Sequence, residues 1–255
     1  MVKLTIDLIG NKAQFAGMHF SHLMNNIPRP FSADHGHEAR QFFAADGEEI
    51  QDFVAAVAGS SPYLKGLIEK EHQWLRGAFA QPDAALKVEF SDLKATAGSD
   101  LMSALRRAKR RVALWTALCD LAGVWALEEV TEALSKFADL ACQISLNHAL
   151  KVQLQRGKIP TRKPETDPAG LGMFVLAMGK LGANELNYSS DIDLICFFDE
   201  SYFASVDVFE ARAGFIRATK NMVALLNDIT AEGYVFRTDL RLRPDPSVTP
   251  VCMGV

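Results

Sequence analysis

Asp191 and Asp193 stand two residues apart at the start of an apolar run, a spacing that suits metal-assisted chemistry. Residues two apart on a strand point to the same face, so both carboxylates are presented together while Ile192 and Leu194 face the core. Carboxylates a few ångströms apart repel each other by on the order of a few kcal/mol at an effective dielectric constant of about 20. Folding gains nothing from this repulsion, so we expect a hard divalent cation to complete the pair and bridge it to phosphate groups.

A third carboxylate, Asp239, lies in a later segment, residues 234–240, that we expect to form another strand. We predict that Asp191, Asp193 and Asp239 converge on a common point and together bind divalent cations, Mg²⁺ with Mn²⁺ able to replace it. The alternative is three surface acids at strand ends that share no ligand.

Cationic and turn-forming residues surround these aspartates, and we predict that they bind phosphate. A glycine turn lets backbone N–H groups approach an anion, and a lysine beside it adds a mobile positive charge. A serine directly before the first aspartate is placed to reach a phosphate oxygen. The alternatives are a solvated lysine and arginines that pair with Asp199 or Glu232. The predicted phosphate-binding residues are Gly179, Lys180, Ser190, Arg241 and Arg243.

Two other phosphate-binding motifs are excluded by the sequence. A Walker A loop needs glycine in place of Phe174 and serine or threonine in place of Leu181. A Gly-x-Gly-x-x-Gly motif must follow a strand, whereas Gly170 and Gly172 precede the expected strand and Val175 breaks the pattern.

The remaining pattern resembles the nucleotidyltransferase superfamily that includes DNA polymerase beta, in which an Asp-x-Asp strand and a third carboxylate hold metals on a nucleotide's phosphates. Residues 179–194 and 239–244 together narrow this to a resemblance to the bacterial bifunctional glutamine synthetase adenylyltransferase and adenylyl-removing family. Lys180 departs from the wider superfamily, where a small residue usually follows the first glycine, but it is the expected residue in this family. The resemblance implies that the three aspartates are catalytic and act through metals.

The resembled enzymes contain two related halves with opposed activities. The N-terminal half removes AMP from a tyrosine of glutamine synthetase by phosphorolysis, and the C-terminal half attaches AMP from ATP. Residues 185–193 read ELNYSSDID, which resembles the N-terminal version; the C-terminal version is richer in glycine. The family implies glutamine synthetase, the PII signal protein, adenine nucleotide and phosphate as partners. Adenylyl transfer from ATP and a non-catalytic or inactive regulatory fragment remain as alternatives.

Composition and charge limit the possible functions further. The chain has 255 residues, of which 49% are hydrophobic and 23% charged, as expected for a globular protein. A net charge of −4 argues against a nucleic-acid-extending enzyme, and no apolar run is long enough to span a membrane. We therefore expect no nucleic-acid or membrane partner and, because the four cysteines lack zinc or Cys-x-x-Cys spacing, reduced thiols in the cytoplasm.

The elements that must position the site divide the sequence into two parts. We predict an α+β protein with a mostly helical region at 1–158, a Pro- and Gly-containing linker at 159–172, and a nucleotidyltransferase core at 173–255 that is truncated at its C-terminus. The predicted helices cover 47–58, a segment starting near 60–64, 100–123, 126–155, and 206–232 with Gly233 as its cap. The predicted strands cover 173–178, 191–198 and 234–240, and a small mixed sheet with flanking helices is expected to hold the site.

Two further patterns are interpreted as surface features that bind no ligand. The helix at 100–123 carries an apolar stripe and five basic residues, which we interpret as a solvated face and not as a phosphate-binding surface. These residues are Arg106, Arg107, Lys109, Arg110 and Arg111. The pairs His19/His22 and His35/His37 lack a further ligand at fixed spacing, so we interpret them as surface histidines and not as metal ligands.

Overall fold

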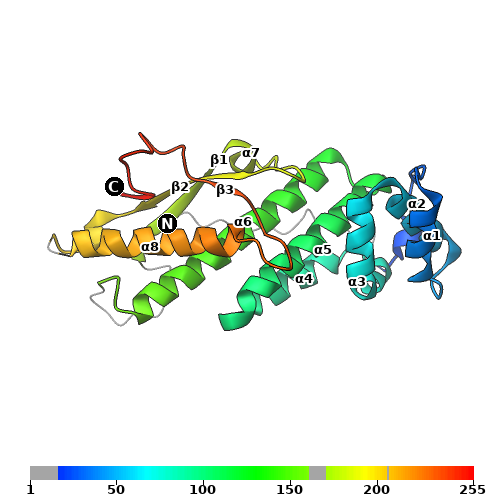
Figure 1. Ribbon diagram of the computed structural model, residues 1–255, viewed down its shortest axis with the longest axis horizontal. Coiled ribbons are helices and arrows are strands. Elements are labelled where there is room, and N and C mark those ends of the chain that lie inside the picture. The colour runs from blue at the N-terminus through cyan, green and yellow to red at the C-terminus, as the bar shows by residue number, and fades with distance from the viewer. Residues whose placement is uncertain (1–16, 161–170, 206) are drawn as a thin grey trace. The chain divides into compact units, whose positions relative to one another are not determined.

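The computed structural model describes residues 17–160, 171–205 and 207–255, and it confirms the α+β class (Figure 1). Its helices are α1 (Ala33–Gln41), α2 (Glu48–Ser60), α3 (Pro62–Ala80), α4 (Ala85–Ala95), α5 (Leu101–Leu121), α6 (Leu127–Gln155), the single turn α7 (Gly179–Gly182) and α8 (Val208–Asn227). Its strands are β1 (Met173–Met178), β2 (Ile192–Phe198), β3 (Thr238–Asp239) and β4 (Cys252–Gly254). Within these ranges, no helix has the length and apolar character that a bilayer crossing requires.

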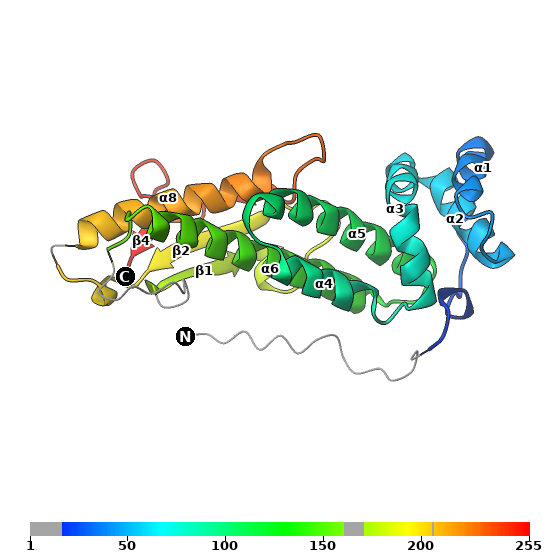
Figure 2. The same cartoon turned by 90° about the horizontal axis from the view of Figure 1, so that it is seen from below.

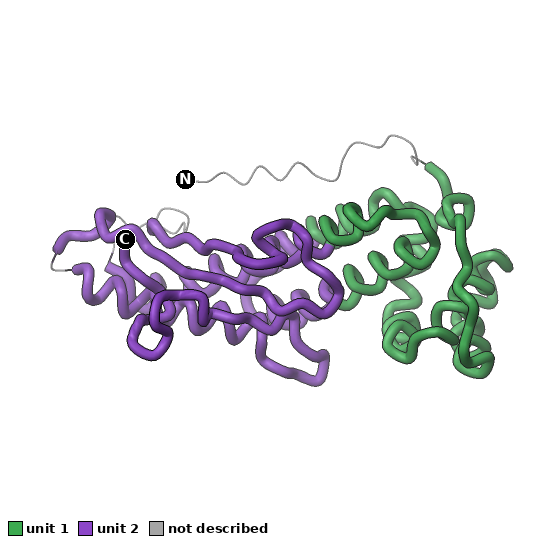
Figure 3. The backbone as a smooth tube through the Cα atoms, turned by 90° about the horizontal axis from the view of Figure 1, so that it is seen from above, with its two compact units in different colours: residues 1–91, 110–133 green, residues 92–109, 134–255 purple. Residues whose placement is uncertain are grey.

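The chain forms two compact units (Figure 3). The first contains the described residues up to Ser91 together with Arg110–Ala133, and the second contains Asp92–Lys109 together with Leu134–Val255. Helices α5 and α6 therefore contribute residues to both units. The predicted linker at 159–172 falls mostly on residues outside those described, and its role as a domain boundary stays a prediction.

The helices with strong periodicity were predicted correctly. On α5, Leu105, Val112 and Leu118 are fully buried, as their spacing requires. Helix α3 begins at Pro62, and the Ser61 hydroxyl accepts a hydrogen bond from the Leu64 N–H at 3.3 Å. Helices α1 and α4 were not predicted; α1 is polar, and its sequence shows no apolar stripe.

The predicted helix over 206–232 is too long at its C-terminal end. Helix α8 ends at Asn227, because Asp228 is extended (φ −63°, ψ 131°) and the chain then turns back on itself. Thr230 and Gly233 bridge across this turn. Gly233, with φ +84°, serves the turn and not the helix, which corrects its predicted role as a cap.

The sheet is small and mixed, as predicted. Strand β1 runs antiparallel to β2, and β2 pairs in parallel with β3 near its start and with β4 near its end. The predicted strand over 234–240 is reduced to the two residues of β3. The reason is local: the N–H groups of Val235 and Phe236 both donate to the Leu226 carbonyl, at 2.9 and 3.0 Å, and not to a neighbouring strand.

The two faces of the sheet differ in burial. Helix α8 packs against β2, β3 and β4, and Figure 2 shows it beside β2 and β4. Phe215 of α8 stacks on Phe198 of β2 with ring centroids 4.8 Å apart. The side chains of Ile192 and Leu194 point to this covered face and are buried. On the opposite face, which we call the open face, alternate residues of β1 are exposed. They are Phe174, Leu176 and Met178.

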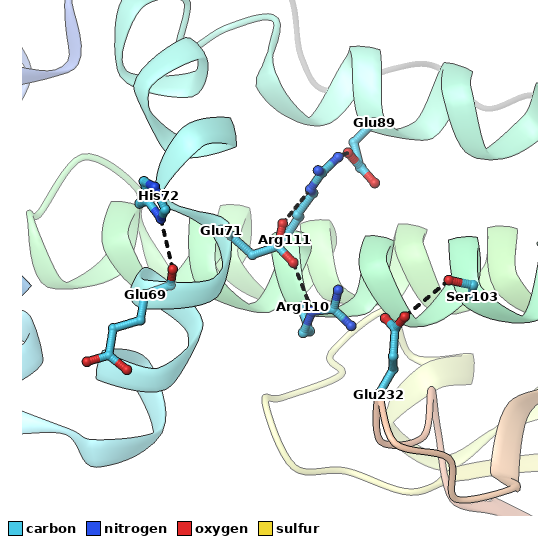
Figure 4. Close-up of polar contacts among 8 residues, drawn as sticks. All are labelled: Glu69, Glu71, His72, Glu89, Ser103, Arg110, Arg111 and Glu232. Atoms are coloured by element: carbon cyan, nitrogen blue, oxygen red, sulfur yellow. Dashed lines mark hydrogen bonds and ion pairs between the residues drawn. The ribbon is translucent and has the colours of Figure 1, made fainter. Parts of the chain in front are cut away.

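The basic residues of α5 do not form a solvated face, so that interpretation is wrong. Glu71 of α3 accepts from the Arg110 and Arg111 Nε atoms, each at 2.8 Å, and Arg111 also donates to Glu89 at 2.9 Å (Figure 4). Both carboxylates are buried. Of the five basic residues, only Arg107 is exposed. Sequence periodicity cannot reveal this, because the partners come from other helices.

Of the remaining two basic residues of α5, Arg106 is buried and Lys109 is half-buried. Arg106 is 1% exposed, and the Lys109 Nζ lies 4.2 Å from the centre of the Phe236 ring. Burial lowers the pKa of Lys109 to about 8. The two residues contact the segment that leads into β3.

Candidate functional site

Two of the predicted aspartates are brought together by strand pairing. Asp193 of β2 and Asp239 of β3 are register partners on parallel neighbouring strands, so their side chains leave the sheet on the same face. That face is the open face, because Asp193 alternates with the buried Ile192 and Leu194. Asp191 precedes β2 by one residue, and its side chain is about half exposed, at 52%. Arg241 interacts electrostatically with all three carboxylates, which places them at one end of the sheet.

Arginine side chains neutralise two of the three carboxylates. The Arg237 Nε donates to Asp191, and its terminal nitrogen donates to the Ser189 carbonyl at 3.1 Å. Arg241 donates from its backbone N–H to Asp239 Oδ1 at 2.7 Å and from its guanidinium to both carboxylate oxygens. These hydrogen bonds hold the pKa of Asp239 below its usual range. The side chain of Asp193 has no hydrogen bond or ion pair to the described residues.

The carboxylates share a face but do not converge on one point as expected. In the part of the chain that the structure describes, no three His, Cys, Asp or Glu side chains are close enough together to hold one metal ion. The cause is that Asp191 turns toward Arg237 and Asp239 turns toward Arg241. The donors nevertheless fit a hard divalent cation in kind, since all are carboxylate oxygens on an accessible face. A cation using them must compete with guanidinium groups that are themselves more than half exposed, at 54% and 82%.

The glycine turn packs directly on the central aspartate. Gly179 has φ +56°, and a Cβ atom added to it would lie 2.7 Å from the Asp193 Oδ2. Gly182, at the other end of α7, would meet the Ala177 carbonyl oxygen at 2.5 Å. Only glycine allows this close approach of backbone to carboxylate and to strand. The predicted phosphate-binding turn therefore lies beside Asp193, and its contact with phosphate stays a prediction.

The other predicted phosphate-binding residues have different surroundings. Lys180 is exposed at the start of α7. The Ser190 hydroxyl donates to the Asn187 side chain. The Arg243 Nε donates to the Thr249 carbonyl at 2.8 Å, and its terminal nitrogens donate to the Leu240 and Pro246 carbonyls. Arg243 thus stabilises its own loop, and contact of these residues with phosphate stays a prediction.

Sequence reasoning missed Arg237 and Ser135. Arg237, Asp239 and Arg241 are spaced two residues apart. The strand alternation that places Arg241 beside Asp239 therefore also points to Arg237. The buried Ser135 of α6 accepts a hydrogen bond from the Leu186 N–H at 3.0 Å and anchors the loop that leads to Asp191. No local signal identifies Ser135, because its partner is 51 residues away.

Comparisons with known proteins identify relatives over most of the chain. The sequence profile of the family described as glutamate-ammonia ligase adenylyltransferase matches residues 32–255. An enzyme named bifunctional glutamine synthetase adenylyltransferase/adenylyl-removing enzyme from Bradyrhizobium sp. (strain ORS 278) is 44% identical over 210 residues, or 80% of this chain and 21% of that protein. Enzymes of the same name from Rhodopseudomonas palustris and Agrobacterium fabrum are 40% and 37% identical, over 87% and 81% of this chain and 23% and 22% of theirs. The chain therefore spans about a fifth of the length of these curated relatives.

Proposed function

The chain belongs to the glutamate-ammonia ligase adenylyltransferase family, and from this membership we propose that it carries the adenylyl-removing activity of such an enzyme. The substrate is glutamine synthetase adenylylated on a tyrosine, and the products are ADP and the unmodified tyrosine. The observation that carries the proposal is the pairing of Asp193 with Asp239 on the open face, with the Gly179 turn packed against Asp193. This arrangement combines anionic oxygens for a cation with a backbone turn for phosphate.

We propose that Asp191, Asp193 and Asp239 hold Mg²⁺, with Mn²⁺ able to replace it. When bound, such a cation neutralises charge on the phosphoryl oxygens. The chain's own cations would orient the anionic substrates: Lys180 from the glycine turn, and Arg241 from the open face once it releases Asp239. The accessibility of these side chains supports the proposal, because a solvated guanidinium or ammonium group can turn toward an anion without unfolding the chain.

Phosphorolysis is the direction that these residues favour. An oxygen of hydrogen phosphate attacks the phosphorus of the AMP group, and the bond from phosphorus to the tyrosine oxygen breaks. ADP forms, and the proton that hydrogen phosphate loses passes through solvent to the tyrosine oxygen. Phosphate is already anionic, so this step needs little help from a general base. The sequence contains no histidine after His148, and none is required in the 173–255 core. The likeness of residues 185–193 to the N-terminal half of the family supports the same direction.

The proposal is tested by supplying adenylylated glutamine synthetase and Mg²⁺ with either inorganic phosphate or ATP. We expect ADP to form in a phosphate-dependent manner, and Asp193→Asn to lower the rate by about 100-fold or more. Asp52→Asn, which changes an exposed acid of α2, is the control and is expected to leave the rate unchanged. Incorporation of AMP from ATP by this chain would assign it to the opposite reaction. Absence of both reactions would favour a regulatory role. Binding of a PII protein is to be tested with a full-length relative.

A further inference from the structure

Arg106 of α5 is a charged side chain buried without a carboxylate hydrogen-bond partner. It is 1% exposed, and its guanidinium hydrogen-bonds, among the described residues, to backbone carbonyls alone. Its Nε donates to Gly233 at 2.8 Å, and its terminal nitrogens donate to Leu225 at 3.2 Å, to Asp228, and to Met102 of its own helix at 3.0 Å. Burial lowers the pKa of Arg106, while nearby Asp228 and Glu232 oppose this effect.

This burial is unfavourable for folding on its own. Moving a guanidinium charge out of water carries a desolvation penalty, and an apolar side chain of similar volume packs in such a position without it. The positions of the carbonyls that Arg106 contacts show which part of the fold its hydrogen bonds stabilise. Leu225 and Asp228 mark the C-terminal end of α8, where a cation is favoured by the helix dipole, and Gly233 closes the following turn. Arg106 therefore fixes the place at which α8 ends and the chain turns back.

A second contact from α5 reaches the same turn. The Ser103 hydroxyl donates to Glu232 at 3.3 Å (Figure 4). After the turn, Phe236 is buried, with its ring centroid 5.6 Å from that of Phe137 of α6 and with Lys109 of α5 on its face. Residues 228–236, which we call the anchor segment, are thus held by contacts with α5 and α6, in which the Arg106 and Phe236 side chains are buried.

The anchor segment leads directly into the candidate site. Arg237, which binds Asp191, is the next residue, and Asp239 follows two residues later. Strand β3 pairs with β2 through only two residue pairs, Ile192 with Thr238 and Asp193 with Asp239. So short a ladder fixes its register weakly by itself. The position of Asp239 opposite Asp193 must therefore depend on what holds the chain before β3.

We propose that Arg106 is a positioning residue for the reaction: by binding the Leu225, Asp228 and Gly233 carbonyls, it sets the path of the anchor segment and so places Asp239 beside Asp193 and Arg237 on Asp191. The inference rests on the proposed function for its catalytic consequence, but its structural part is independent of it. A lysine cannot reproduce the arginine fork that reaches three separate carbonyls.

The test compares Arg106→Met and Arg106→Lys with the matched pair Arg107→Met and Arg107→Lys at the exposed neighbouring position. We expect Arg106→Met to remain folded by circular dichroism and to lower kcat for phosphorolysis by about tenfold or more, with KM for glutamine synthetase changed less than twofold (about the scatter of such constants). Arg106→Lys should recover part of kcat, and both Arg107 variants should match the wild type. If the wild type is active, an equal kcat in Arg106→Met would overturn the proposal, as would a loss matched by the fraction unfolded.

A second readout separates this inference from the proposed function. Hydrogen exchange should accelerate at the Val235, Phe236 and Ile192 amides in Arg106→Met, while amides in the middle of α8 stay protected. If the wild type shows no phosphorolysis but these amides respond, the proposed function fails and the positioning role stands. If the amides do not respond, the positioning role fails whatever the activity.

Discussion

Gly179 shows how the omission of one side chain shapes the candidate site. Gly179 has a positive φ and also lies too close to Asp193 to carry a Cβ atom. Other described glycines have a positive φ without this contact with Asp193. Gly98, for example, has φ +71° but nothing within 4 Å of the position a Cβ would take. The two positions therefore separate backbone strain from crowding of the carboxylate.

We expect Gly179→Ala and Gly98→Ala to lose similar stability, about 1 kcal/mol each, because both place an L-residue at positive φ. Only Gly179→Ala should also lower phosphorolysis, by about tenfold or more, since its methyl group displaces the Asp193 carboxylate. Urea denaturation and initial rates measure the two effects. Equal losses of activity in both variants would show that the contact with Asp193 has no catalytic importance.

Lys109 predicts a pH dependence of stability. Its pKa is about 8 in the folded chain and 10.5 ordinarily, so between these values the unfolded chain binds the extra proton and stability rises with pH. Below about pH 8 both states are protonated, and the cost of burying the charge is constant. We expect Lys109→Met to be more stable than the wild type at pH 7 and to lose the rise above pH 8.

Denaturation by urea at pH 7, 8, 9 and 10, followed by circular dichroism, measures this pH dependence. The control is Lys220→Met, at an exposed position of α8, which should retain the wild-type slope. A Lys109→Met curve parallel to that of the wild type would contradict the assignment of a low pKa to Lys109.

At the scale of elements, the sequence pattern predicts those helices and strands that are set by residues close together in the chain. Helices α5 and α6 and strands β1 and β2 follow from periodicity and apolar runs, and the motif residues around Asp193 follow from their spacing. The extent of β3 does not, because the Leu226 carbonyl captures two N–H groups that a strand would have used. The burial of the α5 cations and the pairing of Asp191 with Arg237 depend likewise on partners distant in sequence.

Helix α6 supports the site loop through one buried hydrogen bond. Ser135→Ala removes the acceptor of the buried Leu186 N–H and should cost about 1–3 kcal/mol, because that donor is left unsatisfied. Ser145→Ala on the same helix is the matched control: Ser145 is equally buried, but its hydroxyl has no hydrogen-bond partner among the described residues. Thermal denaturation of the two variants measures the difference. Equal melting temperatures would refute the importance of the Ser135 contact.

For the whole molecule, unfolding of the first unit can be followed separately by spectroscopy. The tryptophans of the chain are Trp74, Trp115 and Trp125, and all three belong to the first unit. Tryptophan fluorescence therefore reports that unit, whereas circular dichroism reports both. Trp115 is buried against Phe20, with ring centroids 5.1 Å apart, so its emission is expected to shift to longer wavelength when the first unit unfolds.

The first unit contains a buried ion cluster whose removal this signal should detect. Glu71→Gln removes the buried carboxylate that Arg110 and Arg111 share and should destabilise the unit by about 3 kcal/mol, since a central member of a buried ion network is lost. Asp52→Asn breaks the exposed pair with Arg40 and should cost less than about 1 kcal/mol. Urea titrations followed by tryptophan emission compare the two. A smaller loss for Glu71→Gln than for Asp52→Asn would contradict the buried-cluster assignment.

The pairing of β1 affects how this protein must be handled in solution. Among the described residues β1 pairs only with β2, so one row of its backbone N–H and C=O groups has no partner strand. Its sequence, MFVLAM, is uncharged and contains neither proline nor glycine. Such a segment is a template for intermolecular β-sheet formation, the first step toward fibrils. Phe174→Lys, at an exposed position four residues before Met178, the register partner of Asp193, is therefore the substitution of choice for keeping concentrated samples monodisperse.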